Sequence, residues 1–148
     1  MQYDFKDDMN PTCHNLFVYG TLRRGFHHQA FKYIHEHFDF VGDAKLKGIL
    51  YDLGEYPAAV PTTDEKYIIG ELYSIRNIDE FGWAIAQLDD YEGTEPETGE
   101  KAMYRREIAT VYMEGKPNYA WVYWYNDAIS GKPVIYSGDV LEYYSEKK

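Results

Sequence analysis

The first third of the chain combines a short apolar run with one helical pattern. Residues 16–19 are apolar and rich in strand-forming types, and Gly20 follows at once, so we expect a buried strand that enters a turn. Between residues 26 and 38, apolar side chains recur at helical spacing with polar residues between them. This segment predicts a short amphipathic helix.

The middle of the chain has the composition of strands. Residues 40–53 mix β-branched and aromatic types with glycines, which predicts strands with bends. Residues 56–61 contain two prolines and should be extended, because proline disfavours helical backbone in the residue before it. Residues 67–75 predict another strand, in which Gly70 marks a bulge or a close approach of backbone.

A second helix is expected after residue 77. Asn77 or Asp79 can cap it, and Phe81, Ile85 and Leu88 then fall on one face. Its end is expected near residues 92–93, where a glycine suits the left-handed exit from a helix.

The remaining pattern predicts a hairpin and a short tail. Strands at 104–113 and 119–125 are separated by the turn-forming residues 114–118. The tail at 135–144 is aromatic and acidic, with a turn at 137–139. Many strands and two main helices predict one mixed domain of the α+β class.

Composition changes this picture little. The 148 residues fit a single domain, which we expect to span 16–148 after a flexible lead-in at 1–15. The chain has 16 Tyr, 7 Phe and 3 Trp, an excess that favours pleated surfaces and a tyrosine-lined cavity.

The charge balance restricts the partners. The net charge of −10 disfavours nucleic-acid binding, since a phosphate backbone would be repelled. No apolar run reaches membrane-spanning length, and residues 1–13 lack the pattern of a signal peptide. The single cysteine, Cys13, excludes an internal disulfide and suits a reducing compartment. These features predict a cytoplasmic protein.

Gly20 is a first candidate for ligand binding. A glycine directly after a buried strand lets a ligand approach successive backbone N–H groups, which suits a carboxylate or carbonyl oxygen. A strand that simply ends at a glycine is the commoner explanation, so this signal by itself is weak.

Glu92 is the candidate for proton transfer. At the end of the second helix it would share the apolar face with Leu88. Burial, the negative end of the helix dipole and the neighbouring Asp89 and Asp90 would all raise its pKa. We expect Asp89 and Asp90 themselves to point elsewhere, solvated or capping. An ordinary acidic helix end explains the spacing equally well.

Other reactive side chains predict no site. Four histidines gather in the first helix region without a Cys or Glu at ligand spacing, so we expect them on the surface and predict no metal site. Cys13 lies in the expected lead-in without a paired histidine, which disfavours a nucleophilic thiol. Arg23, Arg24 and Arg105 could bind substrate carboxylates, but solvated surface roles are more common.

Four motifs in order then define a resemblance. They lie at residues 17–25 (FVYGTLRRG), 70–73 (GELY), 88–92 (LDDYE) and 104–106 (YRR). Together they resemble the γ-glutamylcyclotransferase-like family, most closely its γ-glutamylamine cyclotransferase branch and small bacterial relatives. The similarity extends from residue 16 to residue 139.

The resemblance implies a compact mixed β-barrel-like sheet with flanking helices and a cavity at one side. It implies that Glu92 is the general acid/base. It also implies a substrate cradle, with weaker candidates on the late hairpin. The cradle residues are Tyr19, Gly20, Thr21 and Leu22, and the weaker candidates are Tyr104, Tyr123 and Tyr125.

The implied reaction converts a γ-glutamyl amine or γ-glutamyl peptide into 5-oxoproline and a free amine or amino acid, without metal or organic cofactor. Two alternatives stay open. One is a binding module for γ-glutamyl-type ligands that does no chemistry. The other is a tailoring enzyme that unmasks a γ-glutamyl-protected natural product by the same reaction.

Overall fold

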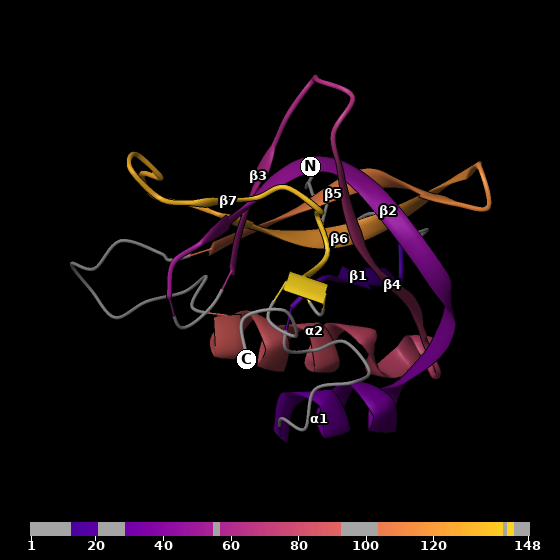
Figure 1. Ribbon diagram of the computed structural model, residues 1–148. Coiled ribbons are helices and arrows are strands. Elements are labelled where there is room, and N and C mark those ends of the chain that lie inside the picture. Colours follow the sequence, from indigo (N-terminus) through magenta and orange to yellow (C-terminus); the bar gives the residue numbers. More distant parts are fainter. Residues whose placement is uncertain (1–12, 21–28, 55–56, 93–103, 141, 144–148) are drawn as a thin grey trace, which may run out of the picture.

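The computed structural model describes residues 13–20, 29–54, 57–92, 104–140 and 142–143 (Figure 1). Its elements in chain order are β1 (Asn15–Val18), α1 (Gln29–His37), β2 (Phe38–Asp52), β3 (Pro57–Pro61), β4 (Tyr67–Ile75), the 3-10 helix η1 (Ile78–Glu80), α2 (Phe81–Glu92), β5 (Tyr104–Met113), β6 (Lys116–Tyr125) and β7 (Val134–Ile135).

Five strands close into a mixed barrel. Neighbouring strands pair in the order β2-β4-β1-β6-β5, and β5 pairs again with β2, which closes the ring. All these pairs are antiparallel except β1 with β6. The α+β barrel-like class that the sequence predicted is confirmed.

The long strand β2 makes the closure possible. Its first part pairs with β4, Lys45 and Leu46 pair with β5, and its last part pairs with β3 and β7. The predicted strands with bends are therefore one continuous strand of 15 residues. The bend is a shift of register between Phe40 and Gly42, as expected of a bulge.

Two cores flank the barrel wall. One fills the barrel with alternate residues of all five strands, including Phe17, Leu46, Leu72, Val111 and Val122. The other packs the opposite side chains against the helices, which lie together on one side of the barrel in Figure 1. Strand alternation supplies both faces, since successive side chains point to opposite sides of a sheet.

Helix α2 follows the predicted face closely. Phe81, Ile85 and Leu88 are all buried in the helix-side core. Asn77 is the cap, as expected, although it caps η1: its Oδ1 accepts a hydrogen bond of 3.0 Å from the Asp79 backbone N–H. The 3-10 turn then continues directly into α2.

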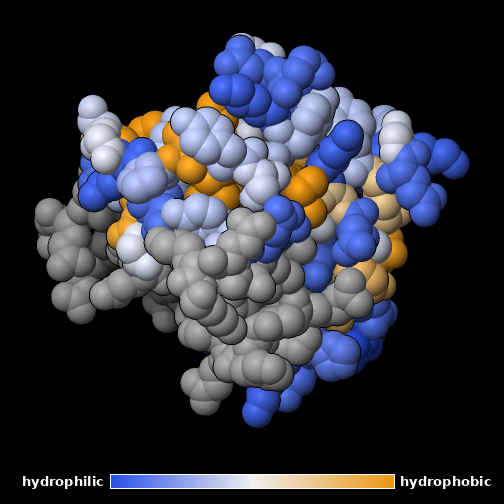
Figure 2. Space-filling view, viewed as in Figure 1, coloured by the Kyte–Doolittle hydropathy of each residue, from blue (hydrophilic) through white to orange (hydrophobic). Residues whose placement is uncertain are grey.

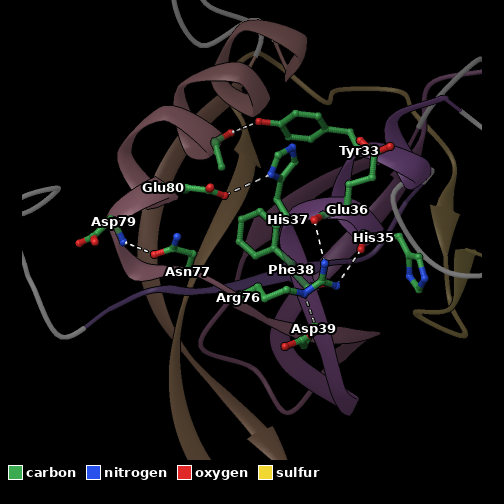
Figure 3. A network of polar contacts seen from close by, with 11 residues as sticks. Tyr33, His35, Glu36, His37, Phe38, Asp39, Arg76, Asn77, Asp79 and Glu80 are labelled. Atoms are coloured by element: carbon green, nitrogen blue, oxygen red, sulfur yellow. Dashed lines mark hydrogen bonds and ion pairs between the residues drawn. The ribbon is translucent and has the colours of Figure 1, made fainter.

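Helix α1 ends one residue earlier than predicted, because Phe38 begins β2. Figure 3 shows Arg76, at the end of β4, reaching the carbonyl end of α1. Its guanidinium donates to the carbonyl oxygens of His35 at 3.0 Å and Glu36 at 2.9 Å, and it pairs with Asp39 at 3.1 Å. Cationic donors suit the last carbonyls of a helix, which have no partner within it.

The hairpin turn is tighter than predicted. Strand β6 begins at Lys116 rather than at residue 119, and the connection is Glu114–Gly115 alone. Both residues have positive φ, 54° and 79°, as a two-residue turn of type I′ requires. The five-residue turn predicted from composition is wrong, because proline and asparagine at 117 and 118 lie within the strand.

The described residues near the two ends of the chain pack on the barrel, with Ile135 and Val140 in the barrel core. Within the predicted lead-in, residues 1–12 lie outside the described part, whereas Cys13 is 2% exposed and Asn15 begins β1. The predicted turn at 137–139 is confirmed, with the Asp139 N–H donating to the Ser137 hydroxyl. No helix in the described residues is both long and apolar enough to cross a membrane. Among the coloured residues in Figure 2, hydrophilic side chains cover the top and lower right of this face, with hydrophobic residues between them.

Candidate functional site

Three strand ends meet at one end of the barrel. Strand β1 runs parallel to β6, with Leu16 opposite Trp121, so Gly20 lies at the same end as Tyr125. Tyr125 in turn pairs with Tyr104, the first residue of β5. The described start of the predicted cradle and the predicted hairpin tyrosines thus belong to one region, which we treat as the candidate active site.

The described half of the cradle is anchored to β6. Tyr19 is buried among the residues that fill the barrel, and its hydroxyl donates a 2.5 Å hydrogen bond to the Tyr123 carbonyl oxygen. Among the described residues, a Cβ added to Gly20 would meet Pro57 alone, at 3.4 Å, which is ordinary contact. The close approach of a ligand to Gly20 stays a prediction, and Thr21 and Leu22 lie outside the described residues.

Tyr104 and Tyr125 form the neighbouring wall. The Tyr104 hydroxyl donates to the Pro57 carbonyl oxygen at 2.9 Å, and its ring meets that of Tyr125 edge-on with centroids 5.6 Å apart. Through Pro57 these contacts bring the start of β3 beside the cradle. Tyr104 is buried and Tyr125 is partly exposed, so Tyr125 is the more accessible of the two to a ligand.

Tyr123 connects this region to the last turn of α2. Its hydroxyl donates a 2.8 Å hydrogen bond to Asp89 Oδ1. Arg106 binds the same carboxylate with two nitrogens, Nε to Oδ1 at 2.7 Å and Nη2 to Oδ2 at 2.9 Å. The prediction that Asp89 is solvated or capping is therefore wrong: it is 6% exposed. Its partners lie 17 and 34 residues away along the chain, beyond any local pattern.

Glu92 is the last residue of α2, three positions after Asp89. Its side chain and that of Asp90 lie outside the described residues, as do Arg23 and Arg24. The predicted rise in the pKa of Glu92 stays a prediction. The helix that carries Glu92 does present the predicted apolar face to the barrel.

Sequence reasoning missed several polar residues of this region. Arg106 belongs to the YRR motif at 104–106 but was given no role. Its place two residues after Tyr104, on the same face of β5, was a usable signal. Glu71 is 2% exposed and its carboxylate accepts a 2.9 Å hydrogen bond from the Tyr73 hydroxyl. Arg105, by contrast, pairs with Glu107 at 3.0 Å, where both side chains are well exposed, in agreement with a surface role.

The other reactive groups that the structure describes form no metal-binding cluster. Among the described residues, no three His, Cys, Asp or Glu side chains are grouped closely enough to hold a metal ion. His35 is exposed and His37 is partly exposed; His27 and His28 lie outside the described residues. Burial raises the pKa of the Cys13 thiol, which disfavours the reactive thiolate.

Comparison with known proteins assigns the family. The family model described as "Gamma-glutamyl cyclotransferase, AIG2-like" matches residues 16–142. The gamma-glutamylcyclotransferase family protein YtfP of Escherichia coli K12 is 34% identical over 128 residues, which cover 86% of this chain and 96% of that protein.

Solved structures agree with this result. The solution structure of E. coli YtfP has a TM-score of 0.59 and 31% identity, covering 88% of this chain and 98% of that one. YkqA of Bacillus subtilis has a TM-score of 0.66 and 28% identity, covering 90% of this chain and 42% of that one. A mouse AIG2-like protein has a TM-score of 0.55 and 25% identity, covering 74% of this chain and 75% of that one. Since the family model covers nearly the whole barrel and its helices, this chain belongs to the gamma-glutamyl cyclotransferase, AIG2-like family.

Proposed function

We propose that this protein converts a γ-glutamyl amine or γ-glutamyl peptide into 5-oxoproline and a free amine or amino acid. Its family membership supports cyclotransferase chemistry. The observation that carries the proposal for this chain is a series of contacts. The Tyr19 hydroxyl donates to the Tyr123 carbonyl oxygen, and the Tyr123 hydroxyl donates to Asp89. These contacts join the start of the cradle to the helical turn that ends in Glu92.

The proposed reaction uses the substrate's own nucleophile. Glu92 accepts a proton from the α-ammonium, and the free amine attacks the γ-carbonyl carbon, which forms the ring C–N bond. The amide C–N bond then breaks as Glu92 returns this proton to the departing nitrogen. The Glu92 carboxylate then takes the remaining extra proton from the ring nitrogen and passes it to the released amine, which leaves as an ammonium. Holding the substrate in its folded conformer supplies the proximity that ring closure needs.

The cradle is proposed to bind the γ-glutamyl group. Backbone N–H groups between Gly20 and Leu22 would hold the α-carboxylate or the oxyanion that develops on the γ-carbonyl. The hydroxyls of Tyr19 and Tyr104 both donate to backbone carbonyls. These two tyrosines therefore support the cradle and shape its wall, while Tyr125 is the better candidate for direct contact with the leaving amine.

Product analysis tests the reaction. A panel of γ-glutamyl amines and dipeptides is assayed for 5-oxoproline and glutamate in ¹⁸O-labelled water, with chelator present because the mechanism needs no metal. We expect unlabelled 5-oxoproline as the first product, and no turnover when the α-amino group is blocked. Labelled glutamate appearing first would mean hydrolysis, and binding without turnover across the panel would identify a binding module.

The role of Glu92 is tested in the same assay. Glu92→Gln keeps the shape of the side chain but cannot accept the proton, so we expect kcat to fall by about 10²–10⁴-fold. Glu80→Gln is the matched control, since Glu80 is exposed just before the opposite end of α2. A loss of less than about tenfold in Glu92→Gln would remove Glu92 from the chemistry.

A further inference from the structure

Asp89 is a buried carboxylate whose two oxygens are both engaged. Oδ1 accepts from Arg106 Nε at 2.7 Å and from the Tyr123 hydroxyl at 2.8 Å, while Oδ2 accepts from Arg106 Nη2 at 2.9 Å. The fork of a guanidinium on both carboxylate oxygens fixes direction as well as distance. Loosely held ion pairs on a surface lack such geometry.

The barrel side of this cluster is held by several contacts. Arg106 and Tyr123 are directly opposite each other in the β5–β6 ladder. The Arg106 guanidinium lies 4.4 Å from the centre of the Trp121 ring, and its side chain is 14% exposed. Trp121 in turn donates its indole N–H to the Cys13 carbonyl oxygen at 3.0 Å. The donors that hold Asp89 are therefore fixed by the sheet and by stacking.

On the helix side, the cluster contacts the last turn of α2, which has few hydrogen bonds of its own. Asp89 and Glu92 are three residues apart in α2, so they are neighbours on the helix surface. The last carbonyls of a helix have no partners within it, and helix ends fray. A contact that fixes Asp89 thus restrains the turn in which Glu92 lies.

We propose that Asp89, Arg106 and Tyr123 form a positioning cluster. This cluster holds the last turn of α2 in the position from which Glu92 reaches the substrate. This inference rests on the proposed function of Glu92. In it, Tyr123 acts through Asp89 and not by contact with substrate. Burying a pair of charges gives little net stability compared with apolar packing. The rate of a reaction, by contrast, depends strongly on the position of its catalytic group.

The first test is Asp89→Asn, compared with Asp79→Asn as the matched control on an exposed residue of η1. The amide keeps the shape but weakens the double contact with Arg106. A shift of the order of 1 Å in a reacting group costs about 10²-fold, so we expect kcat to fall by about 10–10²-fold. KM should change by less than about threefold, since the substrate cradle is untouched.

The decisive test is a double-mutant cycle between Asp89→Asn and Glu92→Gln. If Asp89 acts by placing the Glu92 carboxylate, its substitution should change kcat by less than about twofold once that carboxylate is absent. Equal fold-losses in both backgrounds would overturn the proposal, because a general loss of folded protein acts regardless of Glu92. If Glu92→Gln itself retains activity, the proposed function fails, which is a separate outcome.

A milder variant keeps the proposal testable if Asp89→Asn does not fold. Tyr123→Phe removes the hydroxyl that donates to Asp89 and keeps the ring and the ion pair. We expect a kcat loss of about three- to tenfold that also vanishes in the Glu92→Gln background. A rise in KM with kcat unchanged would instead indicate that Tyr123 contacts the substrate, and would overturn its place in the cluster.

Discussion

At the scale of single residues, the structure explains positions whose role depends on contacts with residues far along the chain. Asp89 is buried because Arg106 and Tyr123 meet it, and no property of Asp89 in the sequence announces this. Gly70 is the opposite case. The sequence predicted a bulge or a close approach, and the ladder runs through Gly70 without a shift of register, so the close approach is the correct alternative.

Gly70 leads to a prediction for stability. A Cβ at this position would lie 2.4 Å from the Val18 carbonyl oxygen and 2.5 Å from Phe17 Cζ. Since the first is backbone in the barrel wall, Gly70→Ala should lower the free energy of unfolding by about 1–3 kcal/mol. Denaturant titration measures this change.

Gly82 supplies the matched control. It lies in α2, and no atom of the described residues beyond its chain neighbours and its own helix backbone lies within 4 Å of an added Cβ. Gly82→Ala should therefore raise the free energy of unfolding by about 0.5–1 kcal/mol through helix propensity. Similar effects of the two substitutions would contradict the steric explanation for Gly70.

At the scale of elements, side-chain hydrogen bonds to backbone carbonyls hold the two helices in place. Arg76 follows β4 and binds the carbonyl end of α1 (Figure 3). The Tyr33 hydroxyl of α1 donates to the Ala84 carbonyl oxygen of α2 at 3.0 Å. Packing of α1 beside α2 thus depends on polar contacts as well as on the apolar stripe that predicted each helix.

We predict that Arg76→Met loosens α1. Methionine keeps most of the aliphatic stem but leaves the His35 and Glu36 carbonyls to water. The loss should be about 1–2 kcal/mol of unfolding free energy, with faster amide hydrogen exchange in α1. Asp39→Asn removes only the exposed ion pair with Arg76 and should cost no more than about 1 kcal/mol. Equal losses in both variants would assign the effect to the ion pair.

At the scale of the whole molecule, one barrel wall serves two cores. Trp124 packs inside the barrel and Trp121 packs against the helices, and both belong to β6. A strand cannot leave one core without exposing the other. This shared wall favours a single cooperative unit.

We therefore predict one unfolding transition for both cores. Variants that keep a single tryptophan, either Trp121 or Trp124, report each core by fluorescence. Within each variant the fluorescence midpoint should coincide with the midpoint from far-ultraviolet circular dichroism, as two-state unfolding requires. If the Trp121 fluorescence midpoint lies at lower denaturant than the circular-dichroism midpoint, the helix-side core unfolds before the strands.

The sequence by itself determined the features that depend on neighbours within a few residues. The strand at 67–75 and the buried face of Phe81, Ile85 and Leu88 follow from periodicity. The four motifs also carried the family, because their order along the chain is a property of the sequence alone.

The tertiary structure decided what depends on residues far apart in the chain. Pairing of β2 with β5 closes the barrel, and Arg106 with Tyr123 turns Asp89 from a surface acid into a buried one. The hairpin turn is two residues long, with positive φ at Glu114 and Gly115, and not five as the sequence predicted. Strand pairing overrode the turn propensity of the residues that follow. Local patterns record which face of an element is apolar, but the partner that covers a polar atom is chosen only when distant elements meet.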